Sequence, residues 1–106
     1  MRELAPDISV FLTTHFGGDA TEAEVLLQTY IGKHPVEKRL DESWRVLRCI
    51  AFLAKGSIPE LKRMIEAAEQ DWRDVIFRAE YVDWTATNPR RVRNFNNSFG
   101  AESLVQ

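Results

Sequence analysis

The sequence predicts an all-α protein, a compact bundle of four or five helices followed by an irregular C-terminal tail. Three observations support this prediction. Apolar residues between positions 58 and 82 recur at alternating spacings of three and four, which only a helix gathers on one face. Capping boxes, in which a hydroxyl and a carboxylate satisfy the first amides of a helix, begin at Thr21 and Ser57. Glycines at positions 17, 32 and 56 close three of the apolar segments.

Two helices are expected in the first third of the chain. The first begins at Pro6 or Asp7 and stops at Gly17, and the second begins near Thr21 and ends at Gly32, ahead of a proline that forbids continuation. The apolar positions that share the inner face of the first helix are Ile8, Phe11, Leu12 and Phe16. Those expected to point inward from the second helix are Val25, Leu26, Tyr30 and Ile31.

The third helix, which runs from Val36 or Asp41 to Lys55, has the broadest apolar face and is therefore expected at the centre. Its inner face consists of Leu40, Trp44, Leu47, Ala51 and Ala54, widened by Val46, Ile50 and Leu53. Cys49 lies within this apolar stretch, where a small buried side chain is the favoured interpretation. As it is the single cysteine, an internal disulfide and a thiolate zinc site are both excluded.

A very short connection through Gly56 joins the third helix to the segment from Ser57 to Val82, so the two should pack as a hairpin. The sequence leaves open whether this segment is one helix or two. Asp71 can cap a new helix that begins at Trp72, and we favour a break there. Trp44 and Trp72, each on an apolar face, are expected to be buried.

The 106 residues fit one domain, with a helical part at residues 1–87 and an irregular tail at residues 88–106 packed upon it. Hydrophobic residues make up 44% of the chain and charged residues 28%, which is typical of a soluble globular protein. The sequence has no apolar run of membrane-spanning length and no secretion signal at its start, so we expect a cytoplasmic protein without membrane contact.

Charge alternates along the chain in blocks. The net charge is −4 over residues 1–32, +4 over 33–63, −4 over 64–87 and +2 over 88–106. The favoured interpretation is that successive helices complement one another, since exposed pairs of this kind are common and individually weak. The alternative is a basic face that binds an acidic partner, for which the candidate residues are Lys38, Arg39, Arg45 and Arg48.

The segment from residue 81 to residue 99 combines aromatic side chains with arginines. The aromatic residues are Tyr81, Trp84, Phe95 and Phe99, and the arginines are Arg90, Arg91 and Arg93. This pattern suits either docking on the protein's own core, which we favour, or contact with a partner that is a protein or a nucleic acid. The tail residues proposed for partner binding are Trp84, Arg90, Arg91 and Arg93.

No catalytic, metal-binding or cofactor-binding set is recognisable in the sequence. Neither His15 nor His34 has a second ligand at a helical spacing, and Asp71, Asp74 and Glu80 are explained by helix starts and a solvated face. We therefore expect a small, non-enzymatic protein-interaction or regulatory module without cofactors, whose partner is another protein or a second copy. A nucleic-acid-associated protein is the alternative, and an enzyme with a site not visible in sequence is the third hypothesis.

Overall fold

A computed structural model describes residues 4–33, 40–82 and 90–103, without the side chains of residues 40–43. The described part is mostly helical and compact, with a radius of gyration of 13.1 Å, so the all-α prediction is confirmed in its broad form. Its elements are α1 (Pro6–Phe16), a 3₁₀ turn (Gly17–Asp19), α2 (Ala20–Lys33), α3 (Leu40–Ala54), α4 (Ile58–Glu80), β1 (Tyr81–Val82) and β2 (Arg90–Arg91).

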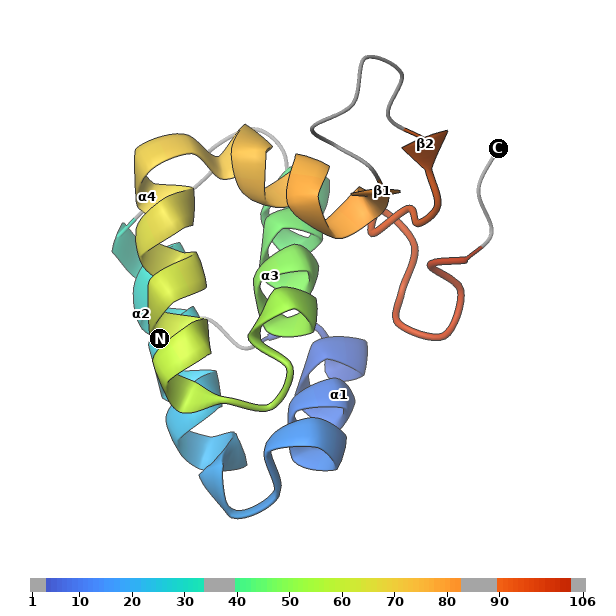
Figure 1. The fold of residues 1–106 in the computed structure, drawn as a ribbon. Helices are drawn as coiled ribbons and strands as arrows, with labels where there is room; N and C mark the ends of the chain where they lie inside the picture. Colours follow the sequence, from blue (N-terminus) through green and yellow to red (C-terminus); the bar gives the residue numbers. More distant parts are fainter. Residues whose placement is uncertain (1–3, 34–39, 83–89, 104–106) are drawn as a thin grey trace.

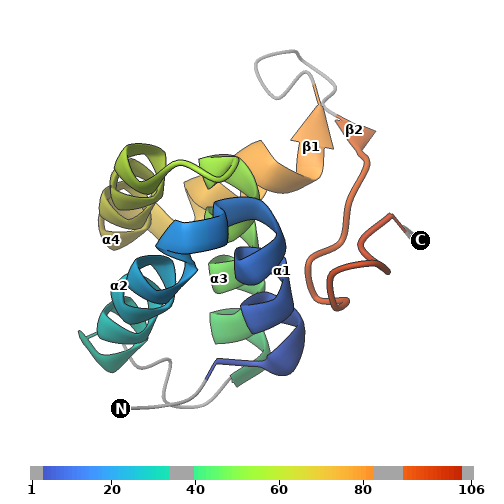
Figure 2. The ribbon, with the colours of Figure 1, turned by 90° about the horizontal axis from the view of Figure 1, so that it is seen from below.

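The sequence analysis did not anticipate the two short strands. They pair antiparallel, with Tyr81 opposite Arg91 and Val82 opposite Arg90. Helix α3 lies between α4 and α1, and the described part of the tail after β2 runs alongside α1 (Figures 1 and 2). The number of helices in the whole chain stays a prediction, because residues 34–39 and 83–89 lie outside the described part. The proposed boundary between helical part and tail at residue 87 also lies outside it.

Helix α1 forms as its sequence predicts. Pro6 occupies the first turn, where its missing N–H costs nothing, and Gly17 ends the helix at a φ of 54°, a conformation that glycine adopts without strain. Three of the four predicted inner residues, Ile8, Leu12 and Phe16, are buried. The fourth, Phe11, is half-buried at the surface, where it packs against the core and contributes to the candidate site.

Helix α2 begins at Ala20, one residue before the predicted Thr21, but two of its side chains depart from the prediction. The carboxylate of Glu24, expected to reach back to the start of α2 in a capping box, accepts a hydrogen bond from the hydroxyl of Ser9 (2.7 Å), which ties α2 to α1. The residues buried along it are Ala23, Leu27 and Ile31, which recur every four residues. Val25 lies two positions from both Ala23 and Leu27, on the opposite side, so its predicted burial is wrong and 47% of it is exposed.

Helix α3 is central, and its residues from Val46 to Ala51 are all buried. Burial raises the pKa of the Cys49 thiol well above its usual value, in keeping with an inert core residue. After Ala54, Lys55 and Gly56 both have positive φ and turn the chain toward α4. A Cβ at Gly56 would lie 2.4 Å from the carbonyl oxygen of His15, so this turn packs directly on the end of α1.

Helix α4 begins at the predicted cap, where the Ser57 hydroxyl accepts from the amide of Glu60 (3.4 Å). The favoured break at Asp71 is also confirmed. Asp71 has non-helical angles (φ −159°, ψ 98°), and its side chain accepts from the amide of Arg73 (3.1 Å), as an N-cap does. The second half of α4 therefore turns across the end of α3 (Figure 1).

The break exposes one residue of the apolar seam. Leu61 and Ala68 before it, and Val75 and Ala79 after it, lie in the core. Trp72 lies at the break itself and is 40% exposed, so its predicted burial is wrong. The predicted seam continues on both sides of the break, and Trp72, next to the non-helical Asp71, is the seam residue that turns outward. Trp44 on α3 is half-buried and packs against the core.

Candidate functional site

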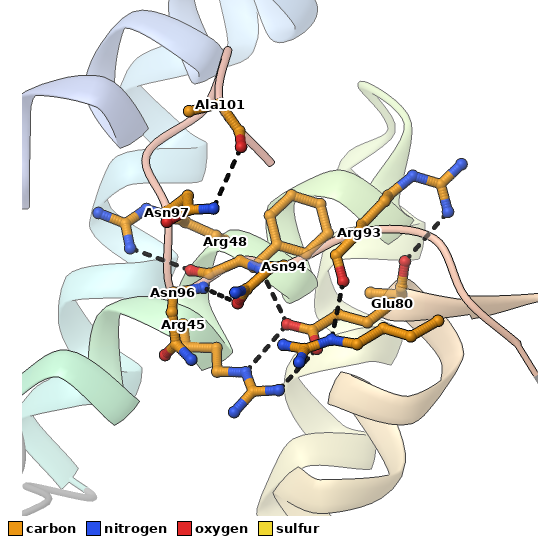
Figure 3. Close-up of polar contacts among 11 residues, drawn as sticks. Arg45, Arg48, Glu80, Arg93, Asn94, Asn96, Asn97 and Ala101 are labelled. Carbon is orange, nitrogen blue, oxygen red and sulfur yellow. Dashed lines mark hydrogen bonds and ion pairs between the residues drawn. The ribbon is translucent and has the colours of Figure 1, made fainter. Parts of the chain in front are cut away.

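The residues proposed from sequence for partner binding are placed in different environments. Lys38, Arg39 and Trp84 lie outside the described residues. Arg90 is exposed on β2. The other four, Arg45, Arg48, Arg91 and Arg93, take part in contacts within the chain, which are drawn in part in Figure 3.

The first group of contacts surrounds Glu80, the last residue of α4. Its carboxylate is fully buried and receives two hydrogen bonds from Arg45, from Nε to Oε2 (2.9 Å) and from Nη2 to Oε1 (2.6 Å). The amide of Phe95 donates to Oε2 as well (2.9 Å; Figure 3). The prediction of a solvated Glu80 is therefore wrong, because the turn at Asp71 directs this end of α4 toward α3 and the tail.

Arg91 adds a second cation to Glu80. Its Nη2 lies 3.0 Å from Oε1 of Glu80, but the N–H direction does not point at that oxygen, so the contact is an ion pair without a hydrogen bond. The Nε of Arg91 donates to the carbonyl of Arg93 (3.1 Å). Arg93 in turn donates to the carbonyl of Ala79 (3.2 Å) and lies over the ring of Phe52 (4.6 Å).

The second group of contacts joins α1, α3 and the tail through Asp7 and Arg48. Arg48, only 7% exposed, donates from Nε and Nη2 to the two oxygens of Asp7 (2.8 and 3.2 Å) and from Nη1 to the carbonyl of Phe95 (3.1 Å). The amide of Phe99 also donates to Asp7 (3.1 Å). Burial alone raises the pKa of Asp7, but these hydrogen bonds and the charge of Arg48 together lower it below its usual value.

Both groups hold the same stretch of the tail. The ring of Phe95 is fully buried beside Phe52, with ring centroids 5.2 Å apart, and the ring of Phe99 stacks on Phe11 at 3.9 Å. Glu80 receives the amide of Phe95, and Asp7 receives the amide of Phe99. Arg45, Arg48, Arg91 and Arg93 thus act as internal anchors of the tail.

An open groove lies where this anchored tail meets α1. Its volume is about 400 Å³, and it is lined by Pro6, Asp7, Val10, Phe11, Thr14, His15, Phe99 and Gly100. The ring of Phe11 lies between those of Phe99 and His15, at centroid distances of 3.9 and 4.1 Å. Val10, at the edge of this groove, is 66% exposed and the most exposed large apolar residue in the described part. We call this surface of α1 and the tail the α1 groove.

The exposed side of α1 is free of charge. This helix is described in full, and its exposed residues are Pro6, Val10, Thr13, Thr14 and His15. None of them has a formal charge when histidine is counted as neutral. The hydroxyls of Thr13 and Thr14 donate to carbonyls of their own helix, those of Ser9 (3.0 Å) and Val10 (2.9 Å). A partner covering this side would therefore leave few polar groups unsatisfied.

The α1 groove was not predicted from the sequence, although the sequence contains one signal for it. Helix α1 has 11 residues, and Asp7 is the one among Asp, Glu, Lys and Arg. This charge content is low for a chain in which 28% of the residues are charged. The groove itself needs Phe99, which lies 88 positions beyond Phe11, and only the fold brings the two rings together.

A smaller pocket of about 150 Å³ lies between α2 and α4, and it is lined by Leu26, Thr29, Tyr30, Lys33, Lys62, Ile65 and Glu69. Burial, aided by the charge of Glu69, raises the pKa of Tyr30. Among the described residues, no three His, Cys, Asp or Glu side chains are grouped so that they could hold a metal ion. None of the described helices has the length and apolarity needed to cross a membrane.

The chain was also compared with known proteins. Neither protein-family models, nor curated proteins, nor solved structures gave a match.

Proposed function

We propose that this chain is a protein-interaction module and that the α1 groove is its contact surface. The observation that supports the proposal is the apolar groove of about 400 Å³, which includes the exposed Val10. The groove lies on α1, a helix that is described in full and whose exposed residues are uncharged. Depletion of charge and enrichment in aromatic residues distinguish the buried centre of protein interfaces from the rest of the surface. An apolar groove with aromatic walls also accepts the anchor side chain of a partner.

Three polar side chains in and beside the groove support this proposal, because they already have hydrogen-bond partners within the chain. Thr13 and Thr14 donate to their own helix, and Asp7 receives Arg48 and the amide of Phe99. When a partner covers such a surface, apolar area is removed from water and these donors and acceptors keep their hydrogen bonds. The same bonds argue against catalysis by Asp7, since a carboxylate with a lowered pKa and occupied oxygens is a poor general base.

The nucleic-acid alternative has less support. It relied on tail arginines that contact phosphates, whereas Arg91 faces the carboxylate of Glu80 and Arg93 donates to the carbonyl of Ala79. In the central basic block, Arg45 and Arg48 are likewise paired with Glu80 and Asp7. Phosphate binding by these side chains would require breaking largely buried ion pairs, which is costly.

The experiment uses the purified, tagged full chain as bait in extract of the cells that produce it, with and without nuclease. Val10→Glu places a charge in the α1 groove, and Val25→Glu makes the same change at an exposed valine of α2. We expect nuclease-resistant capture of protein by the parent chain and the Val25 variant, and loss of capture by the Val10 variant. Equal capture by both variants, or capture abolished by nuclease, would overturn the proposal.

A further inference from the structure

One acidic group at the α1 groove has no cation beside it in the described part of the chain. The carboxylate of Glu102 accepts from the amide of Gly100, a residue of the groove, at 3.0 and 3.3 Å. We propose that the occupant of the α1 groove is a peptide segment of a partner protein that packs an apolar or aromatic side chain beside Val10 and places a Lys or Arg side chain on Glu102. This inference rests on the proposed function, which makes the α1 groove the contact surface.

Glu102 differs from the two carboxylates that anchor the tail. Asp7 and Glu80 each pair with arginines of the same chain. None of the ion pairs between described residues involves Glu102, which is only half-buried. The amide of Gly100 is a neutral donor, so its hydrogen bond leaves the negative charge in place, and a carboxylate has about four lone-pair positions to offer. The remaining positions are available to a cation from another molecule.

The apolar wall of the groove and this charge come from one short stretch of the tail. The ring of Phe99 stacks on Phe11, and its amide donates to Asp7 in the first turn of α1. Gly100 follows directly, and Glu102 lies two residues further on. The backbone from Phe99 to Glu102 spans about 10 Å even when it is fully extended. A single peptide can therefore reach both features with side chains that are only a few residues apart.

The other titratable groups that line the groove do not offset the charge of Glu102. Asp7 is neutralised by Arg48, and His15 is counted as neutral. Residues 1–32, which include α1 and α2, have a net charge of −4. Their field attracts a basic segment and repels an acidic one. The groove alone would accept any apolar anchor, whereas Glu102 favours an anchor with a basic neighbour.

Selection from a phage-displayed library of short random peptides identifies the side chains that the groove accepts. The purified full-length chain is the target. Val10→Asn removes the exposed apolar side chain without adding a charge, so it is used to discard peptides that bind elsewhere. We expect the remaining peptides to combine an aromatic or large aliphatic residue with a Lys or Arg a few positions away. Peptides enriched in Asp or Glu, or in apolar residues without a basic neighbour, would show that the inference is wrong.

Fluorescence anisotropy of one selected peptide, synthesised with a label, measures the contribution of Glu102. Glu102→Gln should weaken binding about threefold, and Glu102→Lys, which opposes two like charges, about tenfold or more. The effect of Glu102→Gln should shrink at high salt. Glu66→Gln is the matched control, because Glu66 is an exposed glutamate of α4 outside the groove lining, and it should bind like the parent. Circular dichroism establishes that all the variants keep their helices.

Exchange of the two charges tests the contact itself. A second peptide, in which Glu replaces the selected Lys or Arg, should bind the parent chain more weakly than the first peptide does. It should bind the Glu102→Lys variant more tightly than it binds the parent. A purely structural effect of Glu102 would weaken both peptides equally, which would contradict the proposed pair.

The outcomes separate this inference from the proposed function. If the selected peptides need Val10 but bind Glu102→Gln as tightly as the parent, the charge does not choose the partner and this inference is wrong. The α1 groove then remains the contact surface. If no peptide binds, or if every selected peptide binds Val10→Asn as tightly as the parent, both this inference and the α1 groove as contact surface are overturned.

Discussion

The carboxylate of Glu80 is fully buried at the end of α4, and Arg45, from the middle of α3, binds both of its oxygens at 2.6 and 2.9 Å. This contact joins residues that lie 35 positions apart in the chain. Because Glu80 also receives the amide of Phe95, it connects the helices to the tail. The pair therefore holds in place the tail that supplies Phe99 to the α1 groove.

Removing Arg45 should destabilise the protein strongly. Arg45→Met leaves Glu80 with Arg91 as its only described cation, and loss of one partner of a buried ion pair costs about 3 to 5 kcal/mol. Arg63→Met is the control, because Arg63 is 70% exposed where it pairs with Glu60 and should change stability by less than about 1 kcal/mol. Urea unfolding followed by circular dichroism measures both. Similar values for the two variants would mean that the contact with Glu80 contributes little.

Truncating the ring of Phe95 should cost about 3 to 5 kcal/mol of unfolding free energy, since this side chain is fully buried in the core. Phe99→Ala should cost less, because Phe99 is only half-buried. A chain ending at Thr87 should be less stable than Phe95→Ala, because it also removes Arg91 and the backbone partners of Glu80 and Arg48. A truncated chain that melts like the parent would contradict the anchoring role of the tail.

Gly56→Ala should destabilise the turn between α3 and α4 by about 1 to 3 kcal/mol. Gly56 has a φ of 78°, and an added Cβ would lie 2.4 Å from the His15 carbonyl oxygen, so the end of α1 would have to move. Gly32→Ala is the matched control, because it lies within α2 and a Cβ there meets open space. This second change should stabilise the protein by up to about 1 kcal/mol through helix propensity. Thermal unfolding of both variants distinguishes the two effects.

The Asp7–Arg48 contact predicts a loss of stability in acid. The pKa of Asp7 is lower in the folded protein than its usual value of 3.8, so the folded state favours the ionised carboxylate. Its contribution is fully present above the unfolded pKa and is lost as pH falls through the folded pKa. Asp7→Asn should therefore be less stable than the parent at pH 7, with a difference that shrinks below pH 3.8. Urea unfolding across this range gives the comparison, and a constant difference would assign the effect to packing.

Local chemistry explains which parts of the fold the sequence predicts. Gly17 ends α1, Ser57 caps α4, and Asp71 interrupts α4, all at the positions that the sequence indicates. Each of these signals acts within a few residues, since a cap satisfies amides in its own first turn and a glycine ends the helix that precedes it. The helical character of the chain is therefore already evident without knowledge of how the helices pack.

The exceptions to the predicted burial, and the candidate site, were decided by the tertiary structure. Glu80 is buried because the turn at Asp71 brings it to Arg45. Val25 is exposed because another face of α2 meets the core, and Trp72 is exposed because it lies at the break in α4. The α1 groove exists only where Phe99 reaches Phe11. Contacts between residues so far apart in the sequence depend on how whole helices are placed relative to one another. The apolar periodicity within one helix gives no information about that placement. The sequence by itself thus determined where helices form and stop, and packing decided which charges became internal anchors and which apolar side chains stayed exposed.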